Sequence, residues 1–198
     1  MILAHRIRLV PTNEQEAYFL RACGVARFAY NWALAEWQRA FEAGEKPSEV
    51  ALRKRLNALK GEQFPWMCEV TKNAPQQAIK NLGRAYANFF DDLKKYRRNA
   101  MPWKRVRVPK FKKKGRHDGF RADNGPDKLH PDAVQTIGKR VKLPIIGWVA
   151  MRSNDSRGRF PANGEVRRIV PKREPSSHDC IGGLPTFAPT SCINLPHR

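Results

Sequence analysis

The sequence predicts an α+β protein in which a helical bundle is inserted into a small β-barrel and a disordered tail follows. Three observations support this prediction. Apolar residues recur at helical spacing in residues 12–98. Short stretches typical of strands flank that region, at 1–11 and 116–152. From residue 153 to the end of the 198-residue sequence, no periodicity remains.

The chain opens with one strand and the signal for a helix. Residues 6–9, Arg-Ile-Arg-Leu, alternate between charged and apolar, which predicts a half-buried strand that ends at Pro11. Thr12 can cap the next helix while Gln15 reaches back to it, as in a capping box. A lone N-terminal strand can join later strands, so the helices would form an insertion.

Apolar side chains spaced by three or four residues then predict three helices. The first is long and ends near Gly44 and Pro47, Ser48 opens a shorter one, and a second long helix lies beyond Pro75. The apolar stripes comprise Phe19, Cys23, Ala26, Tyr30, Leu34, Trp37 and Phe41, then Leu52, Leu56 and Leu59, and finally Ile79, Leu82, Tyr86, Phe89, Leu93 and Tyr96.

The C-terminal part contains short strands and then a different composition. Strands are expected at 119–123, 139–144 and 147–151, where Gly, Pro and Asn separate them as in a small barrel. Residues 153–198 hold six prolines, five serines and four glycines. Such a segment cannot bury enough apolar area to offset its ordering entropy, so we expect disorder.

Charge indicates the class of partner. The formal net charge is +20, from 38 basic and 18 acidic residues. Residues 94–116 hold twelve Lys or Arg and no acid, and Pro102 and Pro109 exclude a continuous helix there. A loop that only keeps a protein soluble needs no such single-sign block. A polyanion is the expected partner, because neutralised phosphates release counterions, and charge alone does not distinguish DNA from RNA.

The candidate nucleic-acid-binding residues lie in two places. In the basic stretch, Tyr96, Trp103 and Phe111 can stack on bases between the cations. On the first helix, Arg21, Arg27 and Arg39 could face a backbone and Asn31 could read a base edge, although for any single one of them an ordinary surface residue of a core helix is the better interpretation. The basic-stretch candidates are Lys94, Lys95, Arg97, Arg98, Lys104, Arg105, Arg107, Lys110, Phe111, Lys112, Lys113, Lys114 and Arg116.

Other function classes find little support in the sequence. No apolar run approaches the ~20 residues that span a bilayer, and the N-terminus is too short in its apolar part for a signal peptide. We therefore expect a cytoplasmic protein without a membrane partner. The scattered carboxylates suggest no catalytic set, and no phosphate loop, zinc-helix motif or nucleophile elbow is present.

Metal binding is the remaining alternative. The cysteines, at 23, 68, 180 and 192, form no C-x-x-C pair and are expected to be free thiols. His178, Cys180, Cys192 and His197 could surround zinc on paper, but their spacing fits no zinc module. We expect no metal, no other cofactor and no small-molecule substrate.

Five ordered blocks of the sequence resemble the OrfB/TnpB-type proteins of bacterial insertion sequences. They cover residues 2–152 and read "RLVPTNEQ", "CGVARFAYNWAL", "FPWMCEVTKNAPQQAIKNLGRAYANFF", "PKFKKKGRHDGFRADNG" and "KLPIIGWVAMR". The resemblance implies a transposon-associated RNA-guided DNA nuclease family of bacteria and archaea, similar to ancestors of type V CRISPR effectors. It also implies a wedge-like barrel at 1–11 and 116–152, a helical bundle at 12–98, and a basic linker at 99–115.

The resemblance further implies site residues and a departure. It suggests a helix-turn-helix-like DNA-binding region around Arg27, Tyr30 and Asn31, and nucleic-acid contact at residues 111–115. In the family, a RuvC-type nuclease domain with three acidic ligands and a zinc ribbon follows. After Arg152 this sequence has neither a Gly-x-Asp-x-Gly motif nor paired C-x-x-C motifs. We therefore expect a truncated or frameshifted protein with an out-of-frame tail at 153–198.

The expected function is binding of DNA, of a guide-like RNA of its own insertion sequence, or of both, without catalysis. The alternatives are a stand-alone RNA-binding or architectural protein unrelated to transposition and, ranked last, a chain that is a nuclease by itself.

Overall fold

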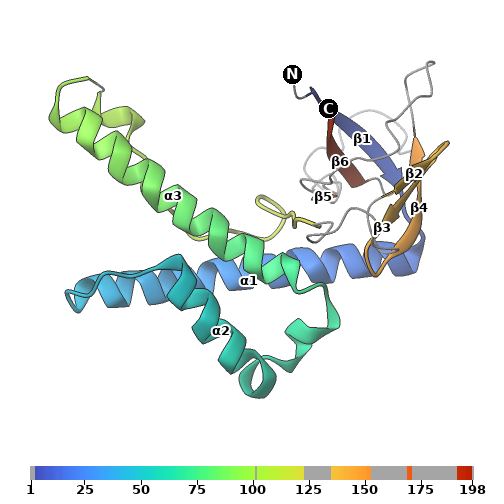
Figure 1. The fold of residues 1–198 in the computed structure, drawn as a ribbon, viewed down its shortest axis with the longest axis horizontal. Helices are drawn as coiled ribbons and strands as arrows, with labels where there is room; N and C mark the ends of the chain where they lie inside the picture. Colours follow the sequence, from blue (N-terminus) through green and yellow to red (C-terminus); the bar gives the residue numbers. More distant parts are fainter. Residues whose placement is uncertain (1–2, 101, 123–134, 153–168, 171–190, 198) are drawn as a thin grey trace, which may run out of the picture. The chain divides into compact units, whose positions relative to one another are not determined.

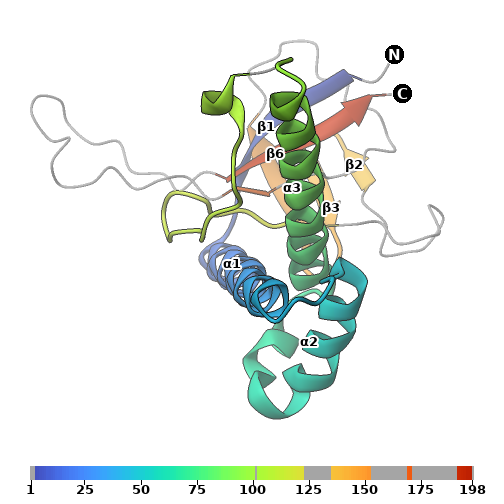
Figure 2. The same ribbon diagram turned by 90° about the vertical axis from the view of Figure 1, so that its left-hand side faces the viewer.

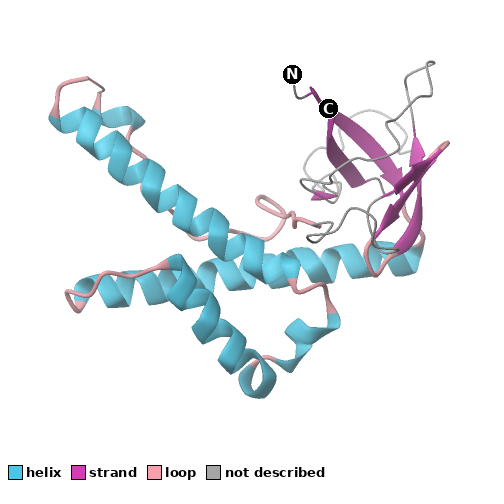
Figure 3. Ribbon diagram, in the orientation of Figure 1, coloured by secondary structure: helices cyan, strands magenta, loops and turns pink. Residues whose placement is uncertain are grey.

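The computed structural model describes residues 3–100, 102–122, 135–152, 169–170 and 191–197. They fall in two compact units, Met1–Cys23 with Asp118–Arg198, and Gly24–His117. Figure 1 shows the elements in chain order, and Figure 3 distinguishes helices from strands by colour. Helices and antiparallel strands are both present, which confirms the α+β class.

The first unit contains one antiparallel sheet, in the strand order β2-β3-β4-β1-β6-β5. The predicted partnership of the N-terminal strand with later strands is confirmed, because β1 pairs with β4 from Arg8↔Arg152 to Val10↔Ala150. The strands are β1 (Leu3–Val10), β2 (Gln135–Ile137), β3 (Arg140–Leu143), β4 (Gly147–Arg152), β5 (Ile169–Val170) and β6 (Ser191–His197).

The sheet is open, so the predicted closed barrel is wrong for the part of the chain that the structure describes. Its two edges are β2 and β5, and no pairing joins them. These edge strands have only three and two residues, which leaves too little ladder to close a barrel. The strand expected at 119–123 is reduced to a single bridge between Phe120 and Ile169.

The structure after residue 152 also differs from the disorder that the sequence predicted. β6 pairs with β1 over seven positions, from Leu3↔His197 to Leu9↔Ser191. Ile169 is fully buried and bridges Phe120 with hydrogen bonds in both directions. The expectation of disorder is therefore wrong for residues 169–170 and 191–197, while 153–168, 171–190 and 198 lie outside the described residues.

The start of the first long helix matches its sequence signal. α1 spans Asn13–Glu42. The Thr12 N–H donates to Gln15 Oε1 at 3.1 Å, and the Gln15 N–H donates to Thr12 Oγ1 at 3.3 Å, which is the predicted capping box. Gln15 Nε2 also donates to the Trp148 carbonyl at 3.1 Å, which fixes the first turn of α1 to β4.

The core of the first unit follows the predicted alternation of β1. Ile7 and Leu9 are buried, whereas Arg8 is exposed. Phe19 of α1 is fully buried and lies 6.1 Å from Phe120, centroid to centroid. These large apolar side chains exclude water from one face of the sheet.

The second unit is built from helices. After the C-terminal part of α1 come α2 (Glu49–Gln63), the 3₁₀ helix η1 (Pro65–Glu69), α3 (Asn73–Arg97) and the 3₁₀ helix η2 (Trp103–Arg105). α1 ends in the predicted turn, where Gly44 has φ +78° and the Glu45 N–H donates to the Ala40 carbonyl at 2.9 Å. α3 starts before Pro75, since proline is tolerated in a first turn.

Ring packing and one close backbone approach hold the three helices together. Trp37 of α1 stacks on Tyr86 of α3, with ring centroids 4.4 Å apart and planes 7° apart. Phe28 meets Phe64 edge-on at 4.9 Å, and Leu52 and Leu56 of α2 are buried. Gly83 of α3 lies against Glu49 of α2, where a side chain would come within 2.8 Å of the Glu49 Cβ.

We expect Gly83→Ala to destabilise the helical unit. Alanine favours a helix by about 1 kcal/mol over glycine, but forced overpacking costs about 1–3 kcal/mol, and the contacted Glu49 Cβ cannot swing away. The matched control is Gly61→Ala in α2, where nothing lies within 4 Å. Denaturant unfolding should show G61A slightly more stable than the parent and G83A less stable. Equal stabilisation by both variants would contradict the close packing of α2 on α3.

We expect Ile169→Ala to destabilise the sheet unit by about 2–5 kcal/mol, because it leaves a cavity around a fully buried side chain. The matched control is Ile137→Ala, since the Ile137 side chain is 65% exposed and its loss should matter little. Urea unfolding measures both. If the segment after residue 152 had no structural role, Ile169→Ala would change the stability as little as the control does.

Candidate nucleic-acid interface

The C-terminal part of α3 extends beyond the other helices of its unit (Figures 1 and 2). In this part of α3, neighbouring elements therefore no longer bury the apolar stripe. Tyr86 is buried, Phe89 is half-buried, and Phe90 and Tyr96 are 38% and 39% exposed. The periodicity that predicted one buried face thus leaves aromatic side chains in solvent at the end of α3.

The chain reverses sharply after α3. Asn99 adopts φ 54°, and the Ala100 N–H donates to the Lys95 carbonyl at 2.9 Å, which is the geometry of a helix C-cap with a left-handed residue. This turn brings η2 back towards α3, where Trp103 meets the Tyr96 ring edge-on at 5.1 Å. Trp103 is 55% exposed, so the pair forms an open aromatic surface.

Basic residues precede and follow this aromatic pair in the sequence. Those described from α3, η2 and the following segment are solvent-exposed, apart from the half-buried Lys112. Two of them already have a partner, because Asp91 lies 3.7 Å from Lys94 and Asp92 lies 3.9 Å from Lys95. Exposed pairs of this kind are weak, so an incoming phosphate can compete for both lysines.

Asn31 of α1 fixes the basic segment to the helix. The Lys112 N–H donates to Asn31 Oδ1 at 2.8 Å, and Asn31 Nδ2 donates to the Lys112 carbonyl at 3.0 Å. The amide group thus satisfies both backbone groups of one residue 81 positions away in the chain. In this arrangement Asn31 faces protein backbone, which differs from the expectation that it reads a base edge.

Tyr30, next to Asn31, holds the side chain of the same lysine. Lys112 Nζ lies 3.9 Å from the centroid of the Tyr30 ring, which is a cation–π contact. Tyr30 is buried, and burial raises the pKa of its hydroxyl above the ordinary value. The phenol therefore stays neutral at physiological pH, and its ring face is occupied by the protein's own ammonium group.

A tight loop follows the anchored lysine. The His117 N–H donates to the Lys113 carbonyl at 3.2 Å, and the Lys113 N–H donates to His117 Nδ1 at 3.3 Å. Gly115 has φ +75°, a conformation that favours glycine. The His117 ring thus has a hydrogen-bond partner four residues away in the chain. The loop presents Lys113, Lys114 and Arg116 to solvent.

The structure brings part of the predicted site together. Within the helical unit, Tyr30 and Asn31 contact the basic segment through Lys112, Phe111 is 51% exposed, and Arg27 is half-buried. Of the residues whose spacing argued against a zinc site, His178 and Cys180 lie outside the described residues. Cys23 is buried and Cys68 is exposed, and neither takes part in a disulfide between described residues.

Among the residues that the structure describes, no group of three or more His, Cys, Asp or Glu side chains could hold a metal ion. None of their helices is both long and apolar enough to cross a membrane.

Comparison with known proteins gives two kinds of match. Residues 1–46 match the family model HTH_OrfB_IS605, described as a helix-turn-helix domain. In the structure this region holds β1, the single continuous helix α1 and the turn after it.

The curated relatives extend the match beyond residue 46. A protein of Escherichia coli strain K12 named as the RNA-guided DNA endonuclease InsQ is 31% identical over 153 residues, which cover 76% of this chain and 34% of the relative. A protein of Mycobacterium tuberculosis, also named as an RNA-guided DNA endonuclease, is 31% identical over 85% of this chain and 38% of its own length. One of Streptomyces pristinaespiralis is 35% identical over 48% of this chain and 24% of the relative.

The chain therefore spans about a third of the length of the first two relatives. On these matches, the chain belongs to the OrfB/TnpB-type family of insertion-sequence proteins.

Proposed function

We propose that the activity of this chain is nucleic-acid binding, and that residues 94–116 form the principal contact surface. The observation that carries the proposal is the exposed aromatic pair, Tyr96 and Trp103, placed among basic side chains at the end of α3. Cations hold phosphates while rings stack on unpaired bases, with a stacking energy of about 1–3 kcal/mol per base. The surface therefore suits single-stranded segments of DNA or RNA.

Asn31 and Tyr30 have a positioning role in this proposal. The segment after η2 has no helix or strand of its own, so only its contacts define its path. Fixing a free backbone costs about 1–2 kcal/mol per residue. By holding Lys112 before the nucleic acid arrives, the two α1 residues lower the entropic cost of binding.

The family suggests which nucleic acids to test. The relatives are named RNA-guided DNA endonucleases, so we propose DNA and a guide-like RNA of the chain's own insertion sequence as partners, at the cytoplasmic nucleoid. A stand-alone protein unrelated to transposition is not retained, because the chain belongs to this family.

We propose binding without cleavage and without a cofactor for this chain. The sequence after Arg152 carries no Gly-x-Asp-x-Gly motif and no pair of C-x-x-C motifs, which the resemblance associates with the nuclease half. An out-of-frame origin of residues 153–198 stays a prediction, and translation of the gene in the other frames would test it. The strands β5 and β6 argue that part of this segment contributes to the sheet.

We expect the affinity for single-stranded DNA and RNA to fall steeply with salt. A protein that makes six to ten phosphate contacts loses about 10³–10⁵ in affinity between 50 and 200 mM salt. Titrations at several salt concentrations give the slope of log affinity against log salt. A double variant, Lys104→Gln with Arg105→Gln, should lower this slope by about two if both side chains hold phosphates.

The same titrations separate binding from catalysis. Binding should persist in EDTA, because it needs no metal ion, and the oligonucleotides should remain intact in Mg²⁺. A flat salt slope would reject the binding proposal. Cleavage in Mg²⁺ that is abolished by substitution of a carboxylate residue would reject the proposal of binding without cleavage. It would establish the chain as a nuclease.

We expect Asn31→Ala to release the basic segment without a change in net charge. The variant loses both hydrogen bonds to Lys112, so trypsin should cut faster within residues 104–116. Affinity should fall by roughly tenfold, because an ordering cost of about 1–2 kcal/mol returns for each residue that must be fixed.

The matched control for this experiment is Asn57→Ala, an exposed asparagine of α2 outside the proposed surface. It should change neither the cutting rate nor the affinity. If Asn31→Ala keeps the helical circular dichroism signal and also keeps the parent's cutting rate and affinity, the anchoring role of Asn31 is wrong.

A further inference from the structure

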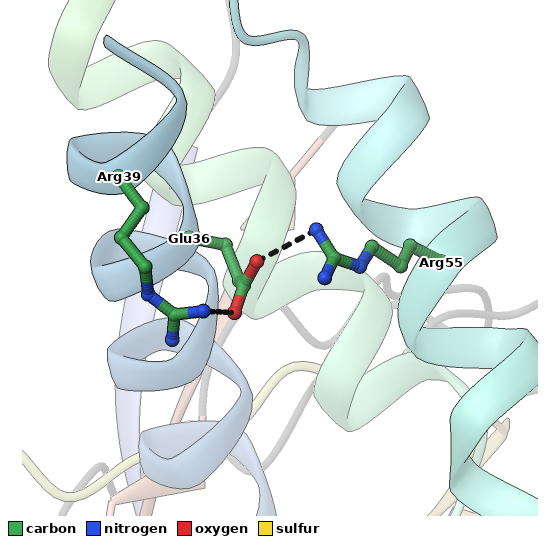
Figure 4. A network of polar contacts seen from close by, with 3 residues as sticks. All are labelled: Glu36, Arg39 and Arg55. Carbon is green, nitrogen blue, oxygen red and sulfur yellow. Dashed lines mark ion pairs between the residues drawn. The ribbon is translucent and has the colours of Figure 1, made fainter. Parts of the chain in front are cut away.

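Glu36 is the one acidic residue with a buried side chain among those described in the helical unit. Its side chain is 7% exposed, and each carboxylate oxygen contacts a different arginine (Figure 4). Arg39 Nη1 lies 2.8 Å from Oε1, and Arg55 Nη1 lies 2.7 Å from Oε2. The two arginines come from α1 and α2, so the carboxylate lies between two helices (Figure 4).

The charges in this cluster do not balance. A buried carboxylate must be paired, and one arginine is enough to neutralise it. The second leaves a net charge of about +1 in the cluster at neutral pH, since guanidinium groups do not deprotonate.

Both arginines also keep capacity for another ligand. Each guanidinium offers five N–H donors in a planar fork. The ion pair with Glu36 is made by Nη1 in each arginine. The Arg39 and Arg55 side chains are 68% and 59% exposed. Much of each guanidinium therefore faces water, while its inner edge is held by a carboxylate that water hardly reaches.

We propose that Arg39 and Arg55 form a binding site for one phosphate group of a nucleic-acid backbone, with Glu36 as its positioning residue. Glu36 holds one guanidinium group on each side of its carboxylate before the ligand arrives (Figure 4), so little side-chain entropy is lost on binding. Phosphate suits the site because planar guanidinium groups bind it through paired hydrogen bonds. DNA and RNA share this phosphodiester group. The inference rests on the nucleic-acid binding proposed above, and it adds a site outside residues 94–116.

A purely structural role is the competing explanation. In that case the cluster only joins α1 to α2, and its loss would lower stability without changing the contact with nucleic acid. The two roles differ in one measurable quantity, the number of phosphates neutralised, which the salt slope reports independently of how much protein is folded.

The experiment compares variants of the full chain on one duplex DNA, one single-stranded DNA and one single-stranded RNA of equal length. Arg39→Gln with Arg55→Gln removes the site. Arg39→Lys with Arg55→Lys keeps both charges but removes the planar forks. Lys54→Gln, an exposed lysine of α2 outside the cluster, controls for the loss of a positive charge. Circular dichroism and thermal unfolding monitor the folded fraction.

The glutamine pair should lower the magnitude of the salt slope by about one, the value for one phosphate contact. It should weaken binding by about tenfold. The lysine pair should keep most of the slope and lose several-fold in affinity, while Lys54→Gln keeps the parent's values. The ligand on which the slope changes identifies the backbone that the site holds.

Two other outcomes would overturn the inference, and they are distinguishable. If the parent binds with a steep slope that Lys104→Gln with Arg105→Gln lowers, but the Arg39 and Arg55 variants keep that slope on all three ligands, the cluster is structural and the proposed function stands. If the parent itself shows a flat slope, the proposed function fails and the phosphate site fails with it.

Discussion

Burial of one apolar stripe on α1 is the constraint on which the rest of the structure depends. The stripe supplies core residues to both compact units, with Phe19 and Cys23 in the first and Tyr30, Leu34 and Trp37 in the second. Because residues three or four apart share a face of a helix, this burial fixes the rotation of α1 about its axis. It thereby also fixes which polar residues flank the buried face, including Asn31 and Glu36.

The same reasoning explains where the candidate interface arises. An apolar stripe is buried only as far as a neighbouring element covers it. On α1 the cover ends before Phe41, which is 63% exposed, and on α3 it ends after Tyr86. Beyond that point α3 is held by its own hydrogen bonds and cap, and its aromatic residues remain available. A helix that extends past the elements packed against it thus produces a surface that is both apolar and basic.

The sequence predicted local features better than long-range ones, for a physical reason. The capping box of Thr12 and Gln15, the stripe up to Trp37 and the alternation of β1 depend on neighbours in the chain, and all three are confirmed. The pairing of β6 with β1 joins segments almost a whole chain apart, and Pro196 within β6 is a residue that argues against a strand. No local pattern records such a partner.

The candidate site shows the same division between composition and geometry. Composition located the basic block at 94–116, since the absence of acids there is visible in the sequence. It could not show that Asn31 and Tyr30 are engaged by Lys112, because that contact joins residues 81 positions apart. For the same reason Glu36 looked like one scattered acid, although the fold surrounds it with two arginines from two helices. A polar residue on a core helix can therefore position the groups that bind a ligand, without contacting the ligand itself. A variant that keeps the charge but removes the positioning contact distinguishes this role from direct binding.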